Sequence, residues 1–151
     1  MNETLTPQEK QQLKTIRLIF IAMAAFLSIM LLAAIVFVTV EGAVQPELNE
    51  YRTWLLVASI SITFICGWAG RRHFLKTIQA ARSSSAPLSV KLTKYQSSLI
   101  VYLALIEVPV IFCIVMLLLT SDTFYQVFGA GLLGSLLVKY PREEKVLGQM
   151  T

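Results

Sequence analysis

Four apolar runs, separated by short polar stretches, dominate the hydrophobic pattern of this chain. They cover residues 18–40, 54–70, 98–120 and 124–138. A helix needs ~20 apolar residues to cross a hydrocarbon core of ~30 Å. The first and third runs reach that length, and the other two lie near its lower limit. The pattern predicts an all-α integral membrane protein, a four-helix bundle forming one domain. For the fourth run, a re-entrant or interfacial helix is the alternative.

Helical signals continue beyond these apolar runs. Thr6, Pro7 and Glu9 form a capping-box pattern that would start the first helix near Pro7, and Gly42 is suited to end it. Apolar positions spaced as one helical face continue past the second run and lead into the third. They are Phe74, Leu75, Ile78 and Ala81, then Leu92, Tyr95 and Leu99. We therefore expect the second and third helices to extend past the membrane as a long hairpin with a short turn.

The distribution of charge agrees with this helix count. Of the 13 Lys and Arg residues, twelve fall in residues 1–17, 71–97 and 139–151. Basic residues that flank transmembrane helices stay in the cytoplasm. Both termini and the central loop are therefore predicted to be cytoplasmic, in a multi-pass protein of the cell inner (plasma) membrane. This topology and attraction to anionic lipids account for the net charge of +4, so nucleic acid is not an expected partner.

The chain carries few groups that could catalyse a reaction. The single histidine, His73, lies in a basic segment, and no acid–base pair or nucleophile constellation is visible. Cys66 and Cys113 are too few for a metal site, and their different depths make a disulfide unexpected. We expect no enzymatic activity, no metal and no cofactor.

A glutamate interrupts the third apolar run. Glu107 comes nine residues after Ser98, which is about 14 Å along a helix and therefore near the middle of a bilayer. A charged side chain at that depth costs about 2.5–3.5 kcal/mol on insertion scales. The carboxyl group is therefore expected to be protonated, to bond a donor, or to face a water-filled cavity.

Hydroxyl groups on the second run are the available partners for this carboxyl. The three candidates are Ser59, Ser61 and Thr63. If the second and third helices are antiparallel neighbours, one of these hydroxyls could meet Glu107. Pro109 cannot bond the carbonyl of Leu105, which predicts a kink and a free polar atom at the same level. These residues are the candidate proton- or cation-binding site. The alternative is a protonated glutamate with a structural hydrogen bond.

Two further features predict contacts with other helices or with lipid. Small residues four apart on the fourth run allow helices to approach closely in lipid. They are Ala130, Gly131, Gly134 and Ser135. Their neighbour is either the first helix of the same chain, which we favour, or another subunit. Arg71 and Arg72 follow the second run directly, where contact with lipid headgroups is expected.

Residues 78–119 place a polar turn, with Arg82 and Pro87, before a helix that carries a lone carboxylate, Glu107. In this respect they resemble the rotor-ring proteolipid, or c subunit, of rotary ATP synthases. In that family the turn is cytoplasmic and the carboxylate carries a proton or sodium ion. The glycine-rich first helix of the family is missing here. The resemblance implies ring assembly and ion translocation.

Two functions of different kinds follow from these features. Glu107 could bind a proton or cation in transport or energy coupling. Alternatively, the chain could be a structural or accessory subunit of a larger membrane complex or a homo-oligomer, held by its helix extensions and its small-residue face.

Overall fold

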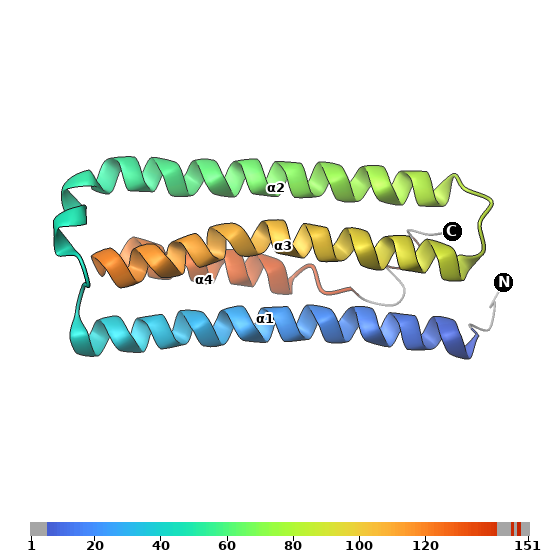
Figure 1. Ribbon diagram of the computed structural model, residues 1–151, viewed down its shortest axis with the longest axis horizontal. Coiled ribbons are helices and arrows are strands. Elements are labelled where there is room, and N and C mark those ends of the chain that lie inside the picture. Colours follow the sequence, from blue (N-terminus) through green and yellow to red (C-terminus); the bar gives the residue numbers. More distant parts are fainter. Residues whose placement is uncertain (1–5, 142–145, 147, 149–151) are drawn as a thin grey trace.

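The computed structural model describes residues 6–141, 146 and 148, and every regular element in these residues is a helix. In chain order the elements are α1 (Pro7–Glu41), the 3-10 helix η1 (Pro46–Tyr51), α2 (Arg52–Arg82), α3 (Leu88–Thr120) and α4 (Thr123–Leu137). The helices lie along one long axis, with α1 and α3 running opposite to α2 and α4 (Figure 1). The predicted all-α architecture of four α-helices is confirmed for the described part of the chain.

The two ends of the bundle differ in chemistry. The basic end carries the start of α1 and the connection between α2 and α3, and α4 stops short of it (Figure 1). The linker end carries residues 42–51 and the turn between α3 and α4. The predicted charges at 142–145 lie outside the described residues. The other basic segments gather toward the basic end.

Local residues set both ends of α1. The Glu9 N–H donates to Thr6 Oγ1 at 3.3 Å, and the Thr6 N–H donates to Glu9 Oε2 at 2.8 Å. The predicted capping box is thereby confirmed, with Pro7 in the first helical turn. After the helix, Gly42 adopts a φ of 81°, which glycine tolerates because it has no Cβ.

The central helix of the bundle is α3. It packs against α1, α2 and α4, whereas α2 and α4 have no comparable contact with each other. Its buried side chains run from Leu92 to Thr120, and its remaining face exposes apolar residues such as Val108 and Ile111. In lipid, such helices are held by close van der Waals packing and by interhelical hydrogen bonds.

A glycine permits the close approach of α2 to α3. A Cβ atom on Gly70 would lie 3.1 Å from Tyr102 Cδ2 and 3.5 Å from Leu105 Cβ. A long side chain at this position would therefore push the two helices apart. The same distances show that Tyr102 and Leu105 face α2, which fixes the rotation of α3 about its own axis.

Three helical segments are long and apolar enough to span a membrane: α1, α2 together with η1, and α3. They contain the predicted spans 18–40, 54–70 and 98–120. The fourth predicted span, 124–138, corresponds to α4, which has 15 residues. Its length of about 22 Å is less than the ~30 Å of a hydrocarbon core. By length and composition alone, the described residues therefore contain three helices that could span a membrane, where four were expected.

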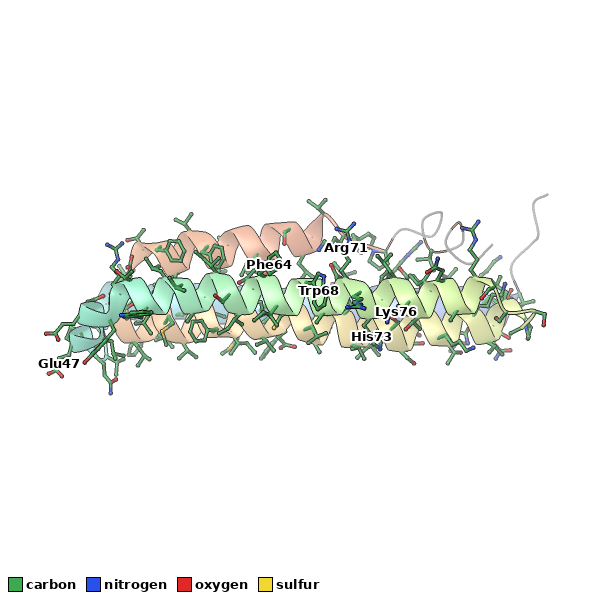
Figure 2. All side chains as sticks on the ribbon, turned by 90° about the horizontal axis from the view of Figure 1, so that it is seen from above. Glu47, Phe64, Trp68, Arg71, His73 and Lys76 are labelled. Atoms are coloured by element: carbon green, nitrogen blue, oxygen red, sulfur yellow. The ribbon has the colours of Figure 1, made fainter. Side chains whose placement is uncertain are left out.

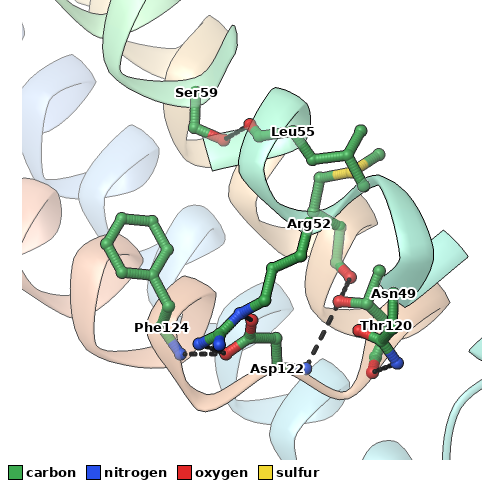
Figure 3. Close-up of polar contacts among 8 residues, drawn as sticks. Asn49, Arg52, Leu55, Ser59, Thr120, Asp122 and Phe124 are labelled. Atoms are coloured by element: carbon green, nitrogen blue, oxygen red, sulfur yellow. Dashed lines mark hydrogen bonds and ion pairs between the residues drawn. The ribbon is translucent and has the colours of Figure 1, made fainter. Parts of the chain in front are cut away.

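A polar cluster joins η1 and the start of α2 to the α3–α4 turn at the linker end (Figure 3). Arg52 Nε donates to Asp122 Oδ2 at 2.6 Å, and Asn49 Nδ2 donates to the carbonyl oxygen of Thr120 at 3.2 Å. Asp122 also caps α4, because its Oδ1 accepts from the Phe124 N–H at 3.0 Å. Asp122 is thus the helix cap of α4, and its ion pair with Arg52 adds a link to α2.

The same contacts set the acidity of Asp122. Partial burial acts to raise its pKa, but the Phe124 N–H and the Arg52 guanidinium outweigh it and hold the pKa below the ordinary value. An unfolded aspartate has a pKa of about 3.9. The stability that the carboxylate contributes is therefore fully present above about pH 4, and it is lost as the pH falls through the lowered pKa.

We predict that Asp122→Ala lowers the stability of the protein by about 1 kcal/mol at neutral pH, because it removes a helix cap. Asp122→Asn keeps the capping oxygen and loses only the pair with the largely exposed Arg52, so its cost is below about 1 kcal/mol. Thermal unfolding in detergent measures both changes. The difference between wild type and Asp122→Asn should disappear in acid. A difference that persists well below pH 3 would contradict the assigned role of the ion pair.

Candidate functional site

Three residues from different elements, Arg71, Tyr102 and Lys139, lie at the same height along the long axis of the bundle. Lys139, just after α4, donates from Nζ to the Tyr102 hydroxyl and lies 5.1 Å from the centre of the Tyr102 ring. Tyr102 packs against α2 at Gly70, the residue before Arg71. Arg71, Tyr102 and Lys139 line one cavity. Tyr102 on α3 is therefore level with the basic residues of both neighbouring elements.

Glu107 lies nearer to this level than to the linker end. It comes five residues after Tyr102 and fifteen before Asp122, which is about 8 Å from one and about 22 Å from the other along the helix. The expected depth of 14 Å placed the membrane boundary at Ser98. Lys139 and Arg71 instead lie level with Tyr102, which is one helical turn after Ser98 on α3. Glu107 is therefore closer to the basic residues than the expected depth of about 14 Å.

The side of α3 that carries Glu107 points away from α2. Each residue of an α-helix is rotated by about 100° from the one before it. Leu105 faces α2, so Glu107, two positions later, is about 200° away from that direction. The expected contact between Glu107 and the hydroxyl groups of α2 is therefore absent from the described residues.

The hydroxyl groups expected to partner Glu107 are engaged or exposed. Ser59 is 1% exposed, and its hydroxyl donates to the carbonyl oxygen of Leu55 at 2.7 Å (Figure 3). The Thr63 hydroxyl donates to the carbonyl oxygen of Ser59 at 2.8 Å, and Ser61 lies on the exposed face of α2. The four predicted ion-binding residues are therefore not brought together as one site.

The neighbouring part of α1 offers no partner either. Gln12 Nε2 donates to Thr93 Oγ1 at 3.4 Å, which sets the register of these parallel helices and places Glu107 level with residue 26. Between residues 18 and 38, the one polar side chain of α1 is Ser28. Its hydroxyl donates to the carbonyl oxygen of Ala24 at 2.8 Å. Glu107 is half-buried and forms no hydrogen bond or ion pair within the described chain.

Pro109 is buried inside α3. It has no N–H, so the carbonyl of Leu105 lacks its helical donor. Leu105 faces α2, whereas Glu107 faces away from it. The freed carbonyl and the carboxyl group therefore share a level but lie on opposite sides of α3, and they do not form the common polar site that the sequence suggested.

Potential metal ligands and thiols are scattered among the described residues. No group of three or more His, Cys, Asp or Glu side chains is placed to hold a metal ion. Cys66 and Cys113 are both free thiols. Among the described residues, Glu107 has no hydrogen-bonded or ion-paired acid or base beside it.

The small-residue face of α4 points away from the rest of the chain. Its members are Ala130, Gly131, Gly134 and Ser135, all exposed. A Cβ atom on Gly131 or Gly134 would meet nothing within 4 Å. Packing within the chain uses the opposite face, where a Cβ on Gly129 would lie 3.5 Å from both Cys113 Cβ and Leu31 Cδ1. The intramolecular role that we favoured for this face belongs to Gly129 instead.

The two arginines expected at lipid headgroups have different surroundings. Arg72 lies over the ring of Trp68, 5.1 Å from its centre. Arg71 lies at the edge of α2 nearest the end of α4, while His73 and Lys76 lie toward the other edge (Figure 2). Arg71 makes no hydrogen bond or ion pair with any described residue. Within the described part of the chain, Arg71 is thus an unpaired cation that lines a cavity.

Comparisons with protein-family models, with curated proteins and with solved structures give no match to this chain.

The association of Lys139 with Tyr102 and with the aromatic residues beside it was not predicted from the sequence. One signal was available, since Tyr95 and Tyr102 are seven apart on a helix and so share a face. The spacing does not show which helix that face meets. The contact with Lys139 depends on where the chain leads after α4.

Two leucine substitutions on α4 test the roles of its two faces. Gly129→Leu should destabilise the isolated chain by about 2 kcal/mol, because the larger side chain overfills a packed contact. Gly134→Leu should leave the thermal stability of the isolated chain almost unchanged, since it projects into open space. Thermal unfolding of both variants in detergent is the measurement. Equal destabilisation would contradict this assignment of faces.

Proposed function

We propose that this chain is an integral membrane protein that serves as a structural or accessory subunit of a larger membrane assembly. In that assembly a neighbouring chain, either another copy or a different protein, supplies the polar partner of Glu107. The observation that carries the proposal is the half-buried residue Glu107, whose carboxyl group is accessible at the surface of the bundle and has no hydrogen-bonding partner in the described chain. An unpaired polar group in apolar surroundings costs free energy, and a partner from outside the chain removes that cost.

The positions of charged residues support a placement in the membrane. Arg52 and Asp122 lie at one boundary, and Arg71 and Lys139 lie at the other. From Arg52 to Arg71, α2 rises by about 28 Å, close to the ~30 Å of a hydrocarbon core. Since Asp122 and Lys139 flank α4, this placement makes it a fourth, short crossing helix.

The same placement leaves parts of three helices outside the membrane. The starts of α1 and α3 and the end of α2 continue past the level of Arg71 and Lys139. Basic residues near helix ends favour the cytoplasm, so the basic end would face the cytoplasm of a cell with its bundle in the inner (plasma) membrane. The long antiparallel extension of α2 and α3 is then a surface for soluble or membrane-bound partners.

The outward face of α4 supports assembly as a second feature. Small residues at that spacing let a helix of another chain approach closely. Gly131 and Gly134 have open space around them, so another helix could pack there without rearranging the bundle.

Proton binding at Glu107, in transport or energy coupling, is the second candidate function. Glu107 is the one acidic or basic side chain between Tyr102 and Asp122 on α3, and its partial exposure gives a partner surface access to it. A proton suits the site better than a metal cation, which would need several oxygen ligands. The resemblance of residues 78–119 to the rotor-ring proteolipid favours the same role.

Two substitutions of Glu107 separate these functions. Glu107→Gln keeps the size and hydrogen-bonding capacity but cannot ionise, whereas Glu107→Leu removes both. If Glu107 is a structural contact, Glu107→Gln should retain the assembly and Glu107→Leu should weaken it by about tenfold, the effect of one buried hydrogen bond. Purification from native membranes in mild detergent, with quantification of the accompanying chains, is the measurement.

Val108→Leu is the matched control, because it changes an exposed neighbour of Glu107 and should leave the assembly intact. If Glu107 binds a proton, Glu107→Gln should abolish proton-dependent activity of the assembly while the subunits still copurify. An assembly that tolerates Glu107→Leu fully, or a chain that purifies as a lone monomer, would overturn the structural proposal.

A further inference from the structure

A cavity of about 280 Å³ lies between α2, α3 and the segment after α4. Its lining includes Arg71 and Phe74 from α2, Tyr95 and Tyr102 from α3, and Lys139 and Tyr140 from the last segment. Both α2 and α4 pack on α3 but hardly on each other. The cavity therefore lies between α2 and the segment after α4, which no connection of the described chain joins directly there.

The cavity combines two cations without a described acidic partner. Arg71 has no hydrogen bond or ion pair in the described chain. Lys139 contacts the hydroxyl and the ring of Tyr102, neither of which neutralises its charge. Glu107, the nearest acid along α3, faces away from α2. Counting only the residues that the structure describes, the cavity therefore has an uncompensated positive charge, which suits an anion.

The remaining lining is aromatic and apolar. Phe74 packs against Tyr95 and Tyr102, with ring centres 5.5 Å and 5.4 Å apart. Leu75 and Leu99 complete this part of the wall. A ligand that fits must therefore join an anionic group to an apolar portion.

The size and position of the cavity limit further which kind of ligand it can hold. Pockets that enclose a whole small-molecule ligand usually measure about 300–1,000 Å³, so this cavity suits a headgroup rather than a complete amphiphile. It lies at the level of Arg71 and Lys139, where the membrane placement proposed above puts the lipid headgroups. A phosphate bound there would leave its acyl chains free to remain in the bilayer.

We propose that this cavity binds the phosphate headgroup of an anionic membrane phospholipid. Arg71 and Lys139 hold the phosphate from opposite walls, because charge-assisted hydrogen bonds to phosphate are the strongest polar contacts available to them. The aromatic wall receives the adjoining glycerol. The bound lipid thereby links α2 to the segment after α4. The inference rests on the proposed membrane placement but is independent of the role of Glu107.

Lipid titration of the full chain in detergent tests this site. Phosphatidylglycerol is added and the bound lipid is counted by native mass spectrometry. Arg71→Gln and Lys139→Gln should each weaken the tightest binding by about tenfold, the loss of one charge-assisted hydrogen bond. Arg71 bonds no described residue, so Arg71→Gln should fold normally even if Lys139→Gln disturbs the contact with Tyr102.

Arg72→Gln is the matched control, since it removes the same charge from the next residue, outside the cavity lining. Retained binding in Arg72→Gln supports the site, and equal weakening by both arginine variants would overturn it in favour of general charge attraction. A second arm adds glycerol phosphate as competitor. If glycerol phosphate does not displace phosphatidylglycerol, the ligand is supported as a membrane lipid. If glycerol phosphate displaces it at equal concentration, the lipid assignment is overturned in favour of a soluble phosphate compound.

Discussion

The packing of α3 against its three neighbours is the interaction on which the rest of the structure depends. Gly70 lets α2 approach one side of α3, and Gly129 lets α4 lie against Cys113 and the α1 residue Leu31. Close approach at small residues is a main source of helix association in lipid, where expulsion of water contributes little. With neighbours covering one half of α3, its other half faces outward, and Glu107 lies at the margin between the two.

This arrangement also explains why α2 and α4 are joined at one end and apart at the other. At the linker end the pair of Arg52 with Asp122 links them directly, at the turn where α4 begins. Toward the basic end both helices rest on α3 without packing on each other, and two cations, Arg71 and Lys139, line the space between them. Like charges repel each other, so the separation at this end is consistent with the chemistry of the residues that line it.

The sequence predicted the features that depend on neighbouring residues along the chain. The capping box at Thr6 and the end of α1 at Gly42 are local, and both were found. The partners of Glu107 were not found, because residue spacing gives depth along a helix but not the direction in which a neighbour lies. The same limit applied to α4, where the sequence offered a face of four small residues and the chain instead packs the face that contains Gly129, Tyr125 and Leu133.

The position of Glu107 affects how its unpaired carboxyl can be tolerated. The cost of a charged side chain in lipid is greatest at the centre of a bilayer and falls toward its boundaries. In the proposed membrane placement Glu107 lies about 8 Å from the level of Tyr102, and its side chain leans toward that boundary because the Cβ atoms of a helix tilt toward its N-terminus. Under the proposed function, a single chain could then insert before its partner arrives, and pairing in the proposed assembly would give the carboxyl group a direct hydrogen bond. Insertion and assembly would in this way be separate steps that use the same side chain.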